Sequence, residues 1–479
     1  MNNLKKIRIS KEAKAAIVLT IATFLCKGIN IITTPIFTRL LTSSEMGVVT
    51  TYNSWYTIIY TIACLSLDSG SFNIAMMEFK DDRYGYMSSI LCLSTFSSFL
   101  IGIIYFLFHD FFNNLFGLNN KLMSLMLISF VFLPATTFWM LHQRYEYKYK
   151  STTLVTILST GVSTVLSAVI TFLFSVEGKY NLPTIKLVSS NLVLIIWGIF
   201  FYCYIMLKGK KLFSKKYLFF VISVNTPLLV HSFAKQILDI SDRTMISYFV
   251  GKRAVGIYGV LYSVSALALI VWTAINSSLV PFMFENLKKE NYSKISVFVE
   301  NMLLVYGIAC IVITLFAPEI LRVLATDEYF EGIYMMPPIA AGIFFTSLYN
   351  IYSNVLLYYK KTGSIMVATS IAATINILLN FIFIQIYGYQ AAAYTTLISY
   401  IFLALIQYYM LKKQLGKISI FNNKKIWGIA IITCVICVAI NLLYIYIYIR
   451  YIIILIIILM MILCRKKILD FLKCVFKRK

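Results

Sequence analysis

Five polar or ionisable side chains lie within thirteen residues of an otherwise apolar segment: His231, Lys235, Asp239, Asp242 and Arg243. On a helix, at about 100° per residue, they fall within one third of the circumference and form a single polar stripe. Ionisable groups inside a membrane helix cost roughly 2.5–3.5 kcal/mol each on insertion scales, and they almost always face a protein interior or a water-filled cavity. In a membrane protein, this stripe would therefore line a polar site.

The composition is that of a membrane protein. Of the 479 residues, 60% are hydrophobic and 13% are charged, whereas a soluble protein carries about 25% charged residues. The mean hydropathy is +0.82, and apolar runs of about 18 or more residues recur along the whole chain. We predict an all-α polytopic membrane protein without a large soluble domain.

Fourteen transmembrane spans account for these runs. We predict them at 13–40, 46–77, 87–108, 121–142, 152–175, 184–207, 217–249, 254–284, 295–317, 333–358, 364–386, 390–411, 426–448 and 450–466. With the N-terminus in the cytoplasm, the inside segments hold 32 of the 43 Lys and Arg residues and the outside segments hold 8. This bias predicts that both termini are cytoplasmic. It also explains the net charge of +24 by topology and contact with anionic lipid, so no nucleic-acid partner is expected.

The two halves of the chain share landmarks at a nearly constant spacing of 207–211 residues. The paired landmarks are Gly47 with Gly256, Glu78 with Glu285, Tyr147 with Tyr358, and Tyr180 with Tyr389. Six spans separate equivalent points, so both halves have the same orientation and form a parallel repeat. We predict two six-helix bundles, 1–208 and 215–415, followed by two extra helices and a basic tail at 424–479.

The repeat relates Lys235 to Lys27, the only charge deep inside the first span. Two lysines facing each other between the bundles would bind an anionic group such as a diphosphate. Lys27, Lys235 and Arg243 are therefore the predicted substrate-binding residues. The alternative is a closed set of i,i+4 ion pairs, in which Asp239 pairs with Lys235 and with Arg243.

Other polar residues are candidates for coupling or gating: His231, Asp239, Asp242, Asp68, Glu78 and Glu285. Asp68 lies within the second span and could hold a coupling proton or sodium ion, or pair with Lys27. Glu78 and Glu285 end their spans and could form gate ion pairs with Arg83 or Lys288. They could equally be solvated helix ends.

Enzymatic activity is not expected. The sequence contains no G-x-x-x-x-G-K-[ST], H-E-x-x-H or G-x-S-x-G motif, and its three histidines are far apart. A membrane glycan polymerase would need a large outside loop, whereas the longest predicted here has about a dozen residues. We predict no catalytic residue, no cofactor and no resident metal. Cys434 and Cys437 form a CxxC inside an apolar run, where helix packing explains them.

Three segments carry a family resemblance: TRLLTSSEMGVVTTYNSW, LDISDRTMISYFVGKRAVGIYGVLYSVS and NILLNFIFIQIYGYQAAAYTTLISY. The chain resembles the Wzx-like polysaccharide repeat-unit flippases of the multidrug/oligosaccharidyl-lipid/polysaccharide (MOP) exporter superfamily. The family's usual GAA reads QAAA here. The resemblance implies a MATE-like fold in a bacterial inner membrane. It also implies transport of an undecaprenyl-diphosphate-linked oligosaccharide, for O-antigen (lipopolysaccharide) or capsule, with a polysaccharide polymerase as a further partner.

Two alternative functions stay open within that superfamily. A flippase for the peptidoglycan lipid precursor would recognise the same diphosphate-lipid group. A drug exporter driven by H⁺ or Na⁺ would bind cationic cargo, which the two lysines disfavour.

Overall fold

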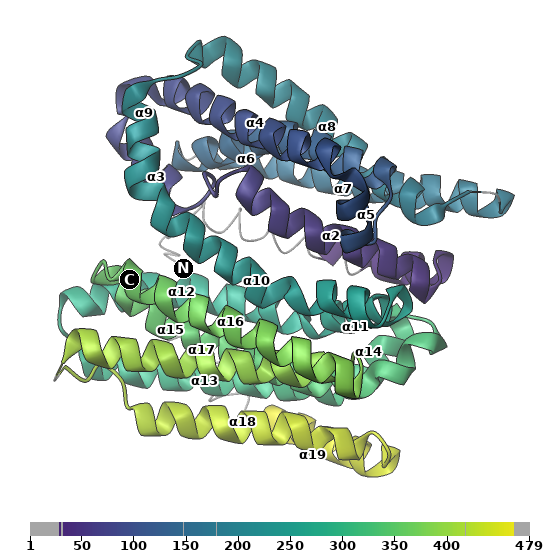
Figure 1. Ribbon diagram of the computed structural model, residues 1–479. Helices are drawn as coiled ribbons and strands as arrows, with labels where there is room; N and C mark the ends of the chain where they lie inside the picture. The colour runs from purple at the N-terminus through teal and green to yellow at the C-terminus, as the bar shows by residue number, and fades with distance from the viewer. Residues whose placement is uncertain (1–27, 30–31, 147, 179, 417, 464–479) are drawn as a thin grey trace, which may run out of the picture. The chain divides into compact units, whose positions relative to one another are not determined.

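The computed structural model describes residues 28–29, 32–146, 148–178, 180–416 and 418–463, and these form helices joined by short turns, with no strand among them (Figure 1). The predicted all-α polytopic fold is thereby confirmed. Clustering of close residues divides the chain into two compact units, Met1–Gly256 and Ile257–Lys479. The predicted boundaries at 208, 215 and 415 concern the sequence repeat and stay a prediction.

The first unit contains most of the predicted N-terminal bundle and also the seventh span. A first helix is described over 32–40. The later elements are α2 Ser43–Ala63, α3 Gly70–Glu78, η1 Lys80–Asp82, α4 Arg83–Leu107, α5 His109–Phe116, α6 Asn120–Tyr145, α7 Tyr149–Glu177, α8 Leu182–Gly209, α9 Lys215–Phe220, the π-helix η2 Val221–Asn225 and α10 Thr226–Phe249.

The second unit begins within α11. Its elements are α11 Lys252–Ser265, α12 Leu267–Lys288, α13 Tyr292–Leu315, α14 Ala317–Leu324, the 3₁₀-helix η3 Asp327–Met335, α15 Met336–Tyr358, α16 Thr362–Tyr387, α17 Ala391–Leu415, α18 Asn423–Leu443 and α19 Ile447–Leu463.

Ten helices of the described chain are long and apolar enough to cross a membrane, and α9 to α10 forms an eleventh if that bent pair is one span. They coincide with the predicted third to thirteenth spans. The predicted first span lies largely outside the described residues. The fourteenth span corresponds to α19, which has a shorter apolar stretch, Ile447–Ile456.

Within the first unit, α8 contacts α4, α6 and α7, and α10 packs along α2. Two glycines allow close helix approach at one end of this packing. A Cβ on Gly47 would lie 1.8 Å from the carbonyl oxygen of Lys252, and a Cβ on Gly256 would lie 1.9 Å from that of Ser43. Because a side chain at either position would collide with backbone, close packing explains why glycine occurs at both of these repeat landmarks.

Within the second unit, α15 is the central helix. It contacts α12, α13, α16, α17 and α18, and 94% of its most apolar 18-residue window is buried. The helix α18 packs on α13 and α15, and α19 contacts α13 and α18. The two C-terminal helices are thus attached to the second unit through α13 and α15.

Two predicted spans are not continuous helices. The second span breaks between Ala63 and Gly70, and the seventh bends by 51° between 215–225 and 228–249. The sequence prediction also missed two short helices, α5 and α14. Each has eight residues and their first residues are 208 positions apart, so they follow the predicted repeat spacing.

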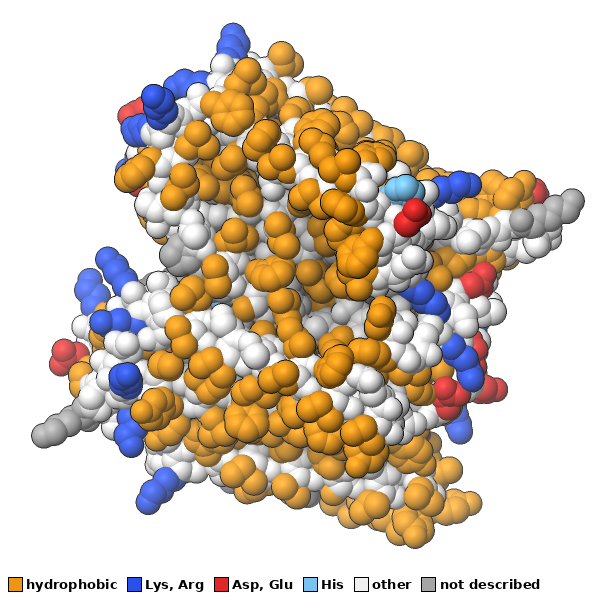
Figure 2. All heavy atoms as spheres, in the orientation of Figure 1, with side chains coloured by type: hydrophobic (Ala, Val, Ile, Leu, Met, Phe, Trp, Pro, Cys, Tyr) orange, Lys and Arg blue, Asp and Glu red, His pale blue; other side chains and the backbone are white. Residues whose placement is uncertain are grey.

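Side chains of different types occupy different parts of the surface. On the face shown in Figure 2, Lys, Arg, Asp and Glu gather near the helix ends, and apolar side chains cover the length between them. Among the exposed apolar residues are Phe99, Ile103, Phe106, Val165, Phe172, Leu378 and Ile432. An apolar surface of this kind is what a lipid bilayer stabilises and water does not.

Candidate functional site

The polar stripe lies on α10, a continuous helix from Thr226 to Phe249. Lys235 and Asp239 are one turn apart and form an ion pair, with side chains 24% and 30% exposed. The alternative of a closed i,i+4 pair is thus realised for these two residues. Partial exposure means that the pair is accessible to a competing ion, because neither charge is sealed in the core.

The rest of the stripe differs in burial. Asp242 is fully buried, and its Oδ1 accepts a 2.7 Å hydrogen bond from the backbone N–H of Arg243. The Arg243 guanidinium reaches the carbonyl oxygen of Asp239 at 3.5 Å. The Nδ1 atom of His231 is buried and has no hydrogen-bond partner within the described chain. The stripe therefore combines a partly exposed ion pair with a buried carboxylate.

Lys27 lies outside the described residues, so its pairing with Lys235 stays a prediction. Asp68 lies in the turn between α2 and α3, within the break of the second span.

The two predicted gate residues occupy helix ends. Glu78 is the last residue of α3 and is exposed. Arg83 instead contacts Glu146 at 3.6 Å and donates a 3.1 Å hydrogen bond to the carbonyl oxygen of Met76. Glu285 pairs with Lys289 at 2.6 Å within α12 and its C-cap. The gating role of both glutamates stays a prediction.

A charged network joins the ends of α4, α8 and α9 in the first unit. The carboxylate of Asp82 accepts hydrogen bonds from the Lys211 ammonium, from the Tyr217 hydroxyl at 2.5 Å and from the Gly85 N–H at 3.1 Å. Lys208 lies over the rings of Tyr84 and Tyr204. Basic residues that the sequence marks only as topology signals thus also make specific contacts.

Glu146, just after α6, is the acidic centre of the adjacent cluster. It contacts Arg83, Lys148 and, at 3.2 Å, the buried His142. Burial by itself raises the pKa of Glu146, but the Lys148 hydrogen bond and the positive charges of Lys148 and Arg83 outweigh burial and lower that pKa. The carboxylate is therefore held in its ionised form.

Sequence reasoning missed a buried polar chain between α16 and α17. Asn376 donates to Ser399 Oγ at 3.2 Å, Asn380 donates to Asn376 Oδ1 at 3.0 Å, and Thr395 donates to Asn380. Asn376, Asn380 and Ser399 are fully buried. The signal was available, because two asparagines four residues apart in an apolar span mark one polar helix face.

A buried ion pair in the second unit was also missed. Arg450 of α19 pairs with Glu319 of α14, the Tyr451 hydroxyl donates to the same Glu319 oxygen at 2.7 Å, and the Arg450 side chain is only 4% exposed. The sequence prediction assigns Arg450 to an outside segment and gives it no partner. A lone arginine within YIYIRYIII was the available signal.

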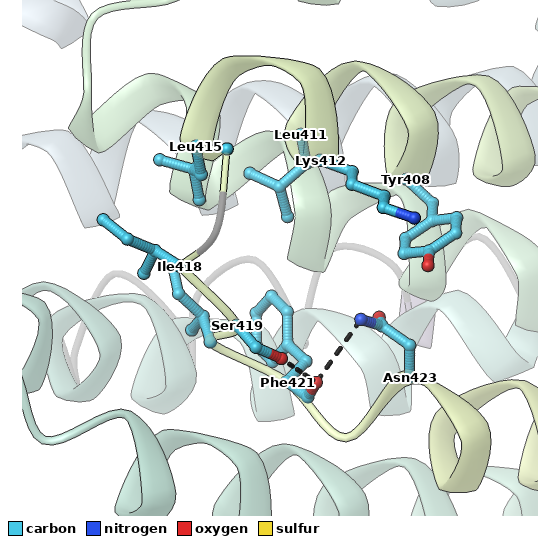
Figure 3. A pocket seen from close by; sticks show the side chains of 10 residues that line it. Tyr408, Leu411, Lys412, Leu415, Ile418, Ser419, Phe421 and Asn423 are labelled. Atoms are coloured by element: carbon cyan, nitrogen blue, oxygen red, sulfur yellow. Dashed lines mark hydrogen bonds between the residues drawn. The ribbon is translucent and has the colours of Figure 1, made fainter.

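The second unit contains a cavity of about 350 Å³ where α17 ends and α18 begins (Figure 3). The side chain of Lys412 extends toward the Tyr408 ring, and Ser419 and Asn423 both donate to the carbonyl oxygen of Phe421 at 3.3 Å. No stripe residue lines this cavity. Its cation and hydroxyl groups at the end of two spans suit contact with a lipid headgroup rather than enclosure of a glycan.

No group of three or more His, Cys, Asp or Glu side chains in the described chain could hold a metal ion. A metal ion bound within the described chain would therefore need hydroxyl, amide or carbonyl oxygens among its ligands.

Comparisons with known proteins identify the class of the fold. An inward-closed structure of the lipid II flippase MurJ superposes with a TM-score of 0.67 at 18% identity, over 94% of this chain and 100% of that one. An inward-facing multidrug transporter of the MATE family gives 0.63 at 14% identity, over 84% and 98%. A MOP superfamily transporter from Pyrococcus furiosus gives 0.58 at 14%, over 85% and 97%. The chain has the MATE-like fold of these proteins.

Sequence comparison then gives the family. Residues 13–287 match the model of the polysaccharide biosynthesis protein family, and residues 227–382 match the MatE model. The chain belongs to the polysaccharide biosynthesis protein family. It is also 25% identical over 298 residues to the uncharacterized membrane protein MJ1068 of Methanocaldococcus jannaschii, a match that spans 59% of this chain and 56% of that protein. The chain is thus a multi-pass membrane protein of the polysaccharide biosynthesis protein family with a MATE-like fold.

Proposed function

We propose that this protein is a flippase that moves undecaprenyl-diphosphate-linked oligosaccharide repeat units across a bacterial inner membrane. The carrying observation is the partly exposed Lys235–Asp239 ion pair on a membrane helix of a polysaccharide biosynthesis protein. A diphosphate is a stronger partner for an ammonium group than one carboxylate, because it offers more charge and more acceptor oxygens. The substrate would replace Asp239 as the partner of Lys235.

The proposed cycle is alternating access with the lipid chain left in the bilayer. In the resting protein, Asp239 neutralises Lys235 and avoids an uncompensated charge at membrane depth. Diphosphate binding opens the pair, and release on the other side restores it. Lys27 would add a second cation, and Arg243 a third, as the repeat and the stripe suggest. Both termini would lie in the cytoplasm, and a polysaccharide polymerase would receive the flipped unit.

Deletion of the gene tests this function directly. We expect loss of surface glycan together with accumulation of unpolymerised lipid-linked repeat unit in viable cells, restored by the wild-type gene. Unchanged glycan and unchanged lipid-linked intermediate would contradict the proposal.

A second candidate is a flippase for the peptidoglycan lipid precursor, favoured by the fold likeness to the lipid II flippase over 94% of this chain. It predicts lysis on depletion instead of loss of surface glycan. A drug exporter predicts heightened sensitivity to cationic drugs with glycan unchanged. The described stripe opposes that reading, because its partly exposed Lys235 ammonium would repel a cationic drug.

A further inference from the structure

The linker between α17 and α18 is strongly basic. Residues 411–425 contain five lysines and no Asp or Glu. Lys425 is paired with Glu300 of α13 at 3.4 Å, whereas Lys412 has no carboxylate partner within the described residues. At neutral pH a lysine is charged, so this linker carries positive charge that the described chain leaves unbalanced.

Lys412 lines the cavity of about 350 Å³ at this linker, and none of the ten residues around that cavity is acidic. In Figure 3, Lys412 and Tyr408 lie on one side of the cavity, opposite Ser419 and Asn423. The Tyr408 hydroxyl has no hydrogen-bond partner within the described part of the chain. Five of the ten lining residues are Leu, Ile or Phe. The cavity thus offers an ammonium group and a phenolic hydroxyl as donors, set in a largely apolar wall.

The first unit has a corresponding linker, and there the chain supplies its own anion. That linker follows α8, the last span of the predicted N-terminal bundle, as the present one follows α17 in the second bundle. Asp82 pairs with Lys211 and accepts a 2.5 Å hydrogen bond from the Tyr217 hydroxyl. The α17–α18 linker has the same two donor types, a lysine and a tyrosine, without the acid. An anion from outside the chain can therefore take the place that Asp82 has in the first unit.

A lipid-facing stripe of α17 leads to Lys412. The large apolar side chains of α17 that are at least 40% exposed are Tyr394, Ile398, Phe402, Leu405 and Tyr409. On a helix, at about 100° per residue, all five lie within about 80° of Lys412. An acyl chain lying along this stripe would have its headgroup at Lys412. The stripe therefore favours a lipid over a soluble anion.

We infer that the cavity between α17 and α18 binds the headgroup of an anionic phospholipid of the phosphatidylglycerol type. The Lys412 ammonium would pair with the phosphodiester, and the Tyr408 hydroxyl would donate to one of its oxygens. A phosphodiester carries one negative charge, which one ammonium balances, whereas a diphosphate carries more. The helix α18 packs on α13 and α15, so the lipid would add a link between α18 and α17. This inference does not rest on the proposed function.

The test measures lipid binding by the purified full-length protein in detergent. Thermal unfolding would be followed with dioleoyl-phosphatidylglycerol, dioleoyl-phosphatidylcholine or inorganic phosphate at equal ionic strength and constant pH. We expect phosphatidylglycerol to raise the unfolding temperature above its value in phosphatidylcholine, because a ligand of the folded state stabilises it. Lys412→Gln should reduce the apparent affinity for phosphatidylglycerol by about fivefold. Tyr408→Phe should reduce it less, because it removes one neutral donor.

The matched control is Lys413→Gln. Lys413 is exposed and adjacent in sequence but does not line the cavity, so this variant removes the same charge and should keep the wild-type affinity. Lys412→Arg should keep most of the affinity, since it keeps the charge. Because the Lys412 side chain is exposed, Lys412→Gln should keep the wild-type unfolding temperature in phosphatidylcholine.

Three outcomes would overturn the inference. Equal shifts with the two phospholipids, or equal losses of affinity in Lys412→Gln and Lys413→Gln, would show a response to acyl chains or to surface charge in general. An equal shift with inorganic phosphate at the same concentration would assign the cavity to a soluble anion. Tighter binding of undecaprenyl diphosphate than of phosphatidylglycerol, lost in Lys412→Gln, would assign the cavity to the proposed substrate.

Discussion

Two ion pairs of this protein differ in the sequence separation of their partners and in the burial of the cation. Lys235 and Asp239 are four residues apart on one helix, and both side chains are about one quarter exposed. Arg450 and Glu319 are 131 residues apart and join α19 to α14, and the arginine is almost fully buried. The first pair can exchange partners without moving a helix. The second pair cannot, because it holds two different helices together.

The difference follows from what happens when each pair opens. An exposed ion pair contributes about 0–1 kcal/mol, because water or another ion solvates the separated charges. Breaking a buried pair leaves an uncompensated charge and costs about 3–5 kcal/mol. Partial exposure is therefore what makes Lys235 a candidate ligand for a diphosphate. Because Arg450 is buried, its ion pair with Glu319 holds α19 against α14.

Glu319→Gln should give the largest loss of stability. The substitution leaves the almost fully buried Arg450 guanidinium without its partner, so we expect the unfolding free energy to fall by about 3–5 kcal/mol. Denaturant unfolding of the purified protein measures this change. The double variant Arg450→Met/Glu319→Gln should recover much of the loss, since it removes both charges. Equal stability of wild type and single variant would show that this ion pair does not stabilise the packing of α19 on α14.

Lys235→Ala should have the opposite profile, with transport abolished and stability changed by no more than about 1 kcal/mol. Restoration of surface glycan in the deletion strain, at matched expression, measures transport. Lys235→Arg should retain part of the activity because it keeps the charge. Lys121→Ala, at an exposed position at the start of α6, serves as the control and should be fully active. Wild-type activity of Lys235→Ala would reject the cationic site.

The sequence predicted the regular part of this fold well, because apolar periodicity and length define a span. It missed the break at Leu65 and Ser66. Neither residue is a glycine or a proline, and the available local signal was the Asp68-Ser69-Gly70 turn signature that follows them. It also did not predict the partner of Arg450, because nothing near Arg450 in sequence identifies Glu319.

In the candidate site, too, the sequence predicted some features and missed others. The stripe and the i,i+4 relation of Lys235 to Asp239 depend only on helix geometry, so sequence alone predicted both. The hydrogen bonds that Asn225, just before α10, makes with Leu65 and Ser71 depend on how two spans pack. Spacing along the chain holds no information about them.

Asp239→Asn tests the role of the acidic partner in the Lys235–Asp239 pair. Without its carboxylate, Lys235 no longer has the competing partner that a diphosphate must replace. We expect pyrophosphate to bind more tightly by up to about fivefold, the equivalent of the roughly 0.2–1 kcal/mol of a partly exposed pair. Calorimetric titration of the purified protein measures this. Tighter binding should slow release, so glycan restoration should fall below wild type. Unchanged or weaker pyrophosphate binding would show that Asp239 does not compete for the anion site.

Glu146→Gln should have the smallest effect, and its pH dependence provides the signature. The pKa of Glu146 is lowered from an ordinary value of 4.5 in the folded protein. Its ionised form therefore stabilises the fold above the unfolded-state pKa, and this stabilisation disappears as pH falls through the lowered pKa. At pH 7 the variant should be less stable than wild type by up to about 1 kcal/mol, because the cluster is partly exposed. The difference should shrink below about pH 4. Lys148→Met removes one of the stabilising charges and should give a smaller loss with the same pH dependence. A stability difference that stays constant from pH 7 to pH 3 would mean that Glu146 acts by packing and not by charge, unlike either ion pair.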